Sequence, residues 1–343
     1  MQINGTPAGY QTADSRNRIV NGAMQISQEN GNSTVGNAAY PTDQWVFLNT
    51  TGSTALAQQY TTATSSSVIY RLRVLINSAD ASHAAAESML VRTTLEGSRI
   101  SDFMWGKSTA LPAVLRFLVT ASTAGVYSVA VRNIPVTESW IGTFTIAPEE
   151  VGLFVWKTVV IPPCLTGTWA TDTAAGMYIS FMIASGPSEV GVLGWQTGNK
   201  TCAPGQVNGT SATGNFAITN VGLYLDPDNT GVAPKWQMPD EAEELRACQR
   251  YWFKAYGASG PVGTTGYRYA GTAGLTFTDA GVIPFPTTMR VNAAGTIDVA
   301  PTYTNCSAGS LVQDLNASVF RVTATAVGSY RAISGVFSFN ARM

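Results

Sequence analysis

The sequence predicts an all-β protein: a jelly-roll β-sandwich, one linking α-helix, and then a smaller C-terminal β domain. Three observations support this fold class. Only 12% of the 343 residues are charged, whereas 10% are aromatic and 33 are glycines. Most apolar residues fall in short runs in which apolar and polar residues alternate. Turn-forming residues separate these runs, and this pattern is typical of antiparallel strands rather than of helices.

The first residues differ from the rest of the chain. Residues 1–18 show no apolar periodicity, so we expect an N-terminal docking arm there, with Ile3 and Tyr10 as its partner-contacting residues. The remaining chain divides into a sandwich, a linking helix and a C-terminal β domain, at residues 19–235, 236–257 and 258–343.

Alternation of apolar and polar residues locates the strands. The sandwich is predicted to contain strands at 68–76, 113–119, 126–131, 157–161, 177–183 and 216–224. The C-terminal domain is predicted to contain strands at 281–285, 295–299, 318–324 and 335–339. Trp45 and Trp156 lie inside such patterns, and we expect both in the core. The Gly-rich connection at 185–214 reads as a surface loop.

One helix is predicted over residues 239–254. Its acidic residues come first and its basic residues last, an order that suits the helix dipole. Asp240 and Glu243 fit a capping box. Leu245, Cys248 and Trp252 recur at helical spacing, so we expect them to pack onto a sheet.

Composition excludes several classes of function. The net charge is −1 and no run of Lys or Arg occurs, which argues against nucleic-acid binding. No segment reaches the roughly 18 apolar residues of a membrane span, and the first residues lack a secretory signal, so we expect synthesis in a cytoplasm without export by that route. The low content of charged residues favours a homo-oligomer, in which subunits cover one another's surface.

The sequence predicts no catalytic residue, no cofactor and no metal site. The single histidine, His83, has no triad pattern around it and is expected in a loop or at a helix start. No pair of cysteines has the CxxC spacing of a zinc or redox site. Asp226 and Asp228 could hold a cation, but a turn is the commoner use of such a segment. An enzyme is kept as an alternative function, because a glycosidase needs only two carboxylates and the sequence contains 21 acidic residues.

Recognition of a sugar is the chemistry that the composition favours. Sugar rings stack on exposed aromatic side chains, and their hydroxyls need hydrogen-bonding neighbours. Trp195 with Asn199, and Trp169 with Asp172, have that composition and are the candidate ligand-binding residues. The alternative is that each tryptophan only anchors its loop onto the sandwich.

Several segments, in a consistent order, resemble a family of bacteriophage tail-fibre and receptor-binding-like proteins with a jelly roll like that of carbohydrate-binding modules. The segments are NRIVNGAMQI at 17–26, YPTDQW at 40–45, FMWG at 103–106, WKTVVIP at 156–162, GTWATD at 167–172, WQTGN at 195–199, ELRACQRYW at 244–252 and PFPTTMR at 284–290. Residues 21–25 lack the acidic residues with which related modules hold Ca²⁺, so the resemblance does not extend to a calcium site.

The resemblance implies a virion location and, in many members of the family, a homotrimer. It does not imply any catalytic residue. We therefore expect a non-enzymatic virion protein, a tail-fibre or receptor-binding component that contacts host-surface polysaccharide and docks onto other virion proteins through residues 1–18. The alternative is a purely architectural capsid fibre, decoration or tail adaptor protein without a ligand of its own.

Overall fold

The computed structural model describes residues 16–61, 69–255, 267–273, 277–299, 302–304, 308–323 and 328–343. It divides the chain into two compact units. The first contains the described residues up to Gln25, together with Asn32–Pro41 and Trp45–Pro239. The second contains Ile26–Gly31, Thr42–Gln44 and Asp240–Met343. Ile3 and Tyr10, the residues expected to dock the N-terminal arm, lie outside the described residues.

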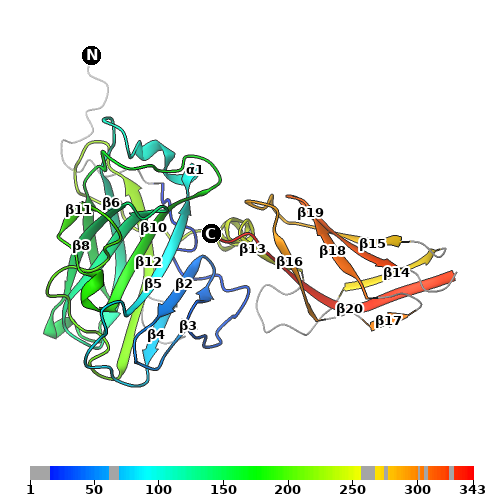
Figure 1. The fold of residues 1–343 in the computed structure, drawn as a ribbon, viewed down its shortest axis with the longest axis horizontal. Coiled ribbons are helices and arrows are strands. Elements are labelled where there is room, and N and C mark those ends of the chain that lie inside the picture. Colours follow the sequence, from blue (N-terminus) through cyan, green and yellow to red (C-terminus); the bar gives the residue numbers. More distant parts are fainter. Residues whose placement is uncertain are drawn as a thin grey trace, which may run out of the picture. The chain divides into compact units, whose positions relative to one another are not determined.

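Two antiparallel sheets form the first unit (Figure 1). The seven-stranded sheet has the strand order β1 (Ala39–Thr42), β2 (Trp45–Asn49), β5 (Ser88–Glu96), β10 (Ala175–Ser185), β7 (Gly125–Asn133), β8 (Glu138–Ile146) and β11 (Gly194–Thr197). The five-stranded sheet has the order β3 (Ala55–Thr61), β4 (Tyr70–Ile76), β12 (Gly214–Leu225), β6 (Ala113–Ala121) and β9 (Val155–Ile161). The chain crosses repeatedly from one sheet to the other, as in a jelly roll.

The core of this unit follows directly from strand alternation. Successive side chains of a strand point to opposite faces, so each strand gives every second residue to the space between the sheets. The Phe117 ring of β6 and the Phe181 ring of β10 meet edge to face there, with centroids 4.8 Å apart. Trp45 of β2 is fully buried, as predicted, and its ring lies 6.1 Å from that of Phe181. The structure thus confirms the predicted all-β sandwich.

Helical segments of the first unit are short and lie between strands. They are α1 (Gly97–Ile100), η1 (Ser101–Phe103), η2 (Pro148–Glu150) and η3 (Pro187–Glu189). Among the described residues, no helix is long and apolar enough to cross a membrane.

The second unit combines the predicted helix with strands, of which β20 is the longest (Figure 1). α2 spans Glu241–Gln249, and the side chain of Asp240 caps it by accepting hydrogen bonds from the backbone N–H groups of Ala242 and Glu243. The strands are β13 (Trp252–Ala255), β14 (Tyr267–Ala273), β15 (Phe277–Pro284), β16 (Ala294–Val299), β17 (Thr302–Thr304), β18 (Ser310–Gln313), β19 (Ala317–Thr323) and β20 (Gly328–Asn340).

The helix is shorter than its sequence pattern predicts. We expected helix as far as residue 254, but Trp252 and the residues after it form β13, which pairs with β20. The reason is tertiary: β13 places Phe253 against the rings of Phe285 and Phe339, at 5.8 and 6.1 Å between centroids. Burying these aromatic side chains in a sheet outweighs the helical preference of the preceding residues.

A buried hydrogen-bond network joins early residues to the C-terminal part of the second unit. Asp43 accepts hydrogen bonds from the backbone and the side chain of Gln28, and Gln28 Nε2 also donates to the carbonyl of Trp252 at 3.0 Å. Burial raises the pKa of Asp43 above its usual range, although the Arg342 charge and the Gln28 hydrogen bonds oppose the shift. No local sequence pattern indicates this pairing, since residues 28 and 252 are far apart in the chain.

Candidate functional site

The outer face of the five-stranded sheet carries exposed apolar and aromatic side chains. On β9, Val159 and Ile161 point into the core, so the alternating residues Trp156 and Val160 point outward. Trp156 is 39% exposed and Val160 is 41% exposed. The prediction that Trp156 belongs to the core is therefore wrong: its strand is apolar on both faces, and register with the sheet decides which face is buried.

Arginines and aromatic rings cross this face together. On β4, Leu72 and Val74 lie in the core, so Arg71 and Arg73 point outward. Both guanidinium groups lie over the ring of Tyr60 on β3, with Cζ 4.6 Å (Arg71) and 3.6 Å (Arg73) from its centroid. Arg71 also lies 5.5 Å from the centroid of Phe154. Arginine stacks on aromatic faces in this way through cation–π attraction.

Arg116 extends the same arrangement to β9. Its Cζ lies 4.4 Å from the ring centroid of Trp156, and its Nη1 donates to the carbonyl of Pro234 at 3.0 Å. We call the whole set the aromatic–arginine band; it consists of Tyr60, Arg71, Arg73, Arg116, Phe154 and Trp156.

The band is a positively charged surface. Burial lowers the pKa of Arg71 below its usual value and the neighbouring Arg73 lowers it further, while Tyr60 raises it. The band places aromatic faces beside guanidinium groups, whose N–H groups are hydrogen-bond donors. A sugar ring and its hydroxyls require this combination.

The tryptophans predicted to bind ligand lie together; Trp169 is buried and Trp195 is half-buried. Trp169 is only 8% exposed, and its ring centroid lies 4.9 Å from that of Trp105 and 5.9 Å from that of Trp195. The indole N–H groups of Trp195 and Trp169 donate to the carbonyls of Pro162 and Thr166, at 2.8 and 3.1 Å. These contacts anchor both residues to the sandwich.

Asn199 and Asp172 do not hydrogen-bond to these indoles. The Asn199 carbonyl oxygen accepts from Nη1 of Arg132, and Asp172 accepts from the backbone N–H of Ala174 at 2.9 Å. Both residues are exposed. Trp195 itself lies on β11, at the edge of the seven-stranded sheet, rather than in the loop that we expected. A role for these four residues in ligand binding stays a prediction.

A second stack of arginines occupies the outer face of the seven-stranded sheet. Arg92 and Arg132 lie 4.4 and 5.5 Å from the ring centroid of Tyr178. Arg132 is 6% exposed, and its pKa is lowered to about 10 by burial, with a further contribution from Arg92. Glu189 opposes this shift. This stack contains one aromatic ring and is more buried, so it offers less surface to a sugar than the band does.

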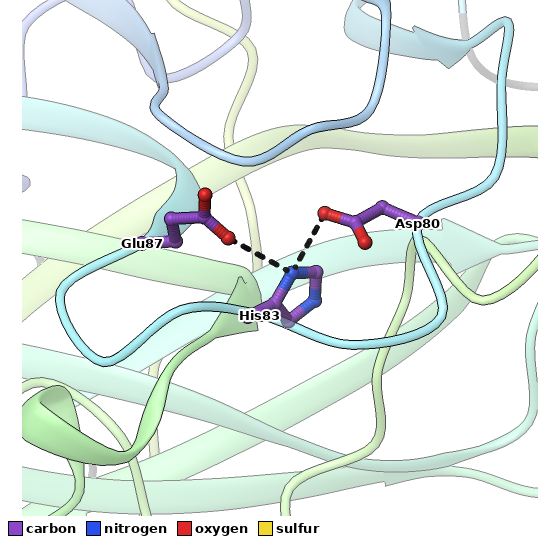
Figure 2. A group of neighbouring side chains, drawn as sticks. All are labelled: Asp80, His83 and Glu87. Carbon is purple, nitrogen blue, oxygen red and sulfur yellow. Dashed lines mark hydrogen bonds and ion pairs between the residues drawn. The ribbon is translucent and has the colours of Figure 1, made fainter.

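Asp80, His83 and Glu87 form a cluster in the loop between β4 and β5 (Figure 2). His83 Nδ1 lies 3.1 Å from Asp80 Oδ2 and 3.9 Å from a Glu87 oxygen, and His83 Nε2 lies 2.9 Å from Asn208 Oδ1. Both ring nitrogens face oxygen atoms, so each is engaged within the protein. His83 lies in a loop, as predicted.

Backbone contacts hold this cluster in place. Desolvation raises the pKa of Asp80, but hydrogen bonds from the backbone N–H groups of Ser82 and Gly52 and the proximity of His83 outweigh it, so that the pKa lies below its usual range. Asn208 Nδ2 also donates to the Asp80 carbonyl at 2.8 Å. One histidine and two carboxylates are ligand types that divalent cations accept. In this structure, hydrogen bonds of the cluster to Gly52 and Asn208 connect three loops of the first unit.

The segment at Asp226 forms the turn that the sequence favoured over a cation site. Asp226 is fully buried, and its carboxylate accepts hydrogen bonds from the backbone N–H groups of Thr230 and Gly231 at 3.0 and 2.7 Å. The side chains of Cys164, Cys202 and Cys248 are buried.

Comparison with known proteins does not assign a family. No family model and no curated protein matches the chain. Among solved structures, the enzymatically active domain of bacteriophage CBA120 tailspike protein 4 matches with 13% identity and a TM-score of 0.32, over 61% of this chain and 21% of that chain.

Two carbohydrate-binding modules are similar at the same low level. The family 11 module of the cellulosomal cellulase Lic26A-Cel5E of Clostridium thermocellum has 13% identity and a TM-score of 0.29, over 57% of this chain and 95% of that chain. A CBM4 structure has 11% identity and a TM-score of 0.34, over 60% and 98%. These values are too low to transfer a function.

Proposed function

We propose that the chain is a non-enzymatic glycan-binding protein of a bacteriophage virion, a tail-fibre or receptor-binding component that contacts host-surface polysaccharide through the aromatic–arginine band. The observation that carries the binding proposal is Trp156, which is 39% exposed on a sheet face with Arg116 stacked 4.4 Å from its ring. An exposed indole beside guanidinium donors suits a sugar ring and its hydroxyls. The motifs shared with tail-fibre-like proteins support the virion location.

A binding assay with the full chain tests this proposal. We expect saturable binding to purified surface polysaccharide of the host, without release of reducing sugar ends at any pH. Absence of binding to host cells and to purified polysaccharide would contradict glycan recognition. Release of reducing ends would show an enzyme instead.

A purely architectural role, as a capsid fibre, decoration or tail adaptor, is the second candidate. Exposed aliphatic side chains support it: Leu153 is 58% exposed and Val160 is 41% exposed, and such side chains are frequent in protein–protein contacts. This candidate predicts that the intact oligomer binds virion proteins but no glycan.

We further propose that the protein is a homotrimer whose residues 1–18, with Ile3 and Tyr10, dock onto other virion proteins. The support is the low content of charged residues, 12%, which leaves an isolated subunit with little charge for solubility. Light scattering coupled to size exclusion should give three times the 36.2 kDa mass of one chain. A mass equal to that of one chain would contradict the proposal.

A further inference from the structure

We propose that the glycan bound by the aromatic–arginine band is acidic, and that the carboxylate of a uronic-acid-type sugar lies between Arg71 and Arg73. This inference rests on the proposed function, since it specifies the chemistry of the ligand at the same site.

The charge on this sheet has one sign. The five strands β3, β4, β6, β9 and β12 contain three arginines and one lysine, and none of their residues is Asp or Glu. The whole chain has a net charge of −1, so these five strands are more positive than the chain as a whole. A face of this kind attracts anions and repels cations.

The acidic residues nearest to these strands in sequence are engaged elsewhere. Glu150, before β9, forms an ion pair with Lys157 at 2.8 Å. Asp226, directly after β12, accepts hydrogen bonds from Thr230 and Gly231. Lys157 is thereby neutralised as well. The charge that remains on the outer face is that of the three arginines.

Arg71 and Arg73 are neighbouring charges, since Arg73 acts electrostatically on Arg71. They occupy alternate positions of one strand and share the ring of Tyr60. Two guanidinium groups held this close repel each other, and a carboxylate between them would offset the repulsion. Planar carboxylates suit the arginine fork because two parallel N–H···O bonds can form.

Arg116 differs from this pair, since its Nη1 already donates to the carbonyl of Pro234. We therefore assign it to holding Trp156 rather than to binding the acid group. In this arrangement the Arg71–Arg73 pair binds the carboxylate, while Phe154 and Trp156 contact sugar rings further along the glycan. Arg71 lies within 5.5 Å of the Phe154 ring, which makes the two parts continuous.

The test compares each acidic glycan with its own neutral form. Oligomers of galacturonate, glucuronate-containing hyaluronan and alginate are each used before and after chemical reduction of their carboxyl groups to alcohols, together with neutral glucan and mannan. Binding to the full chain is measured by calorimetry. At least one acidic glycan should bind about tenfold or more tightly than its reduced form. Added salt should weaken only the acidic interaction.

Arginine variants locate the preference. Arg71→Gln and Arg73→Gln should each lower the ratio of acidic to reduced affinity about tenfold, and Arg71→Lys should restore part of it. Arg92→Gln is the matched control, because Arg92 also stacks on a tyrosine but on the other sheet. It should leave the ratio unchanged. Circular dichroism confirms that each variant is folded.

The outcomes separate the two proposals. If reduced or neutral glycans bind as tightly as acidic ones, the band binds sugars but the acidic-ligand inference is wrong. If the Arg92 variant loses the preference while the Arg71 and Arg73 variants keep it, the acid group is bound on the other sheet and the assignment is overturned. If no glycan in the set or from the host surface binds, the proposed function itself fails.

Discussion

Replacing Trp45 by alanine is expected to destabilise the first unit by about 3–5 kcal/mol, the usual cost of removing a large aromatic side chain from a packed core. Trp45 is fully buried, its ring packs near that of Phe181, and its indole N–H donates to the carbonyl of Asn21 at 3.2 Å. The substitution leaves a cavity between the two sheets and removes the indole hydrogen bond to the Asn21 carbonyl, which also accepts from the backbone N–H of Met24. A fall of roughly 10 °C in the melting temperature of this unit should follow.

Trp156→Ala is the matched control for this measurement. It removes the same side chain from the same unit, but from an exposed position on the outer face of β9. Its expected cost is below about 1 kcal/mol. Thermal unfolding followed by circular dichroism compares the two variants. Equal destabilisation would contradict the assignment of Trp45 to the core and of Trp156 to the surface.

Sequence patterns predicted the strands in which apolar and polar residues alternate strongly. β10 and β12 contain the predicted strands at 177–183 and 216–224, because one face of each strand is continuously apolar. Strands with a weaker pattern were missed, among them β11, which is four residues long and begins with glycine. The end of α2 was also misplaced, because the residues after it gain more from packing against β20 than from extending the helix.

The candidate site was only partly accessible to sequence reasoning. The alternation of Arg71 and Arg73 with Leu72 and Val74 is a signal that two arginines share an outer face. Nothing in the sequence pairs them with Tyr60 or Phe154, which come from other strands or loops. The pairing of strands that are far apart in the sequence creates the band, and local sequence patterns do not encode that pairing.

Long-range packing also explains why the tryptophans predicted to bind ligand are not the exposed ones. Trp195 and Trp169 lie in polar, glycine-rich segments, which suggested exposed loops, yet both pack against Trp105. Trp156 lies in an apolar segment, which suggested burial, yet it is exposed. Composition indicated recognition of a sugar by aromatic side chains. Only the arrangement of the sheets distinguishes the rings that anchor a segment from the rings that are exposed to a ligand.

Trp156→Ala is expected to weaken binding of the host-surface glycan about thirtyfold, the loss typical of an exposed aromatic residue that carries much of an interface. Trp195→Ala should leave the affinity within about twofold in molecules that remain folded, because its indole is held by the carbonyl of Pro162 and by neighbouring rings. Its main effect should be on stability, since it removes a ring from a packed cluster.

The most direct test of the glycan-binding surface is therefore the affinity of these two variants for the same glycan, measured by calorimetry at a temperature where both are folded. The proposed binding surface predicts a large loss for Trp156→Ala and an almost unchanged affinity for Trp195→Ala. The opposite result, with binding lost only when Trp195 is replaced, would place the sugar at β11 and contradict the role of the five-stranded sheet.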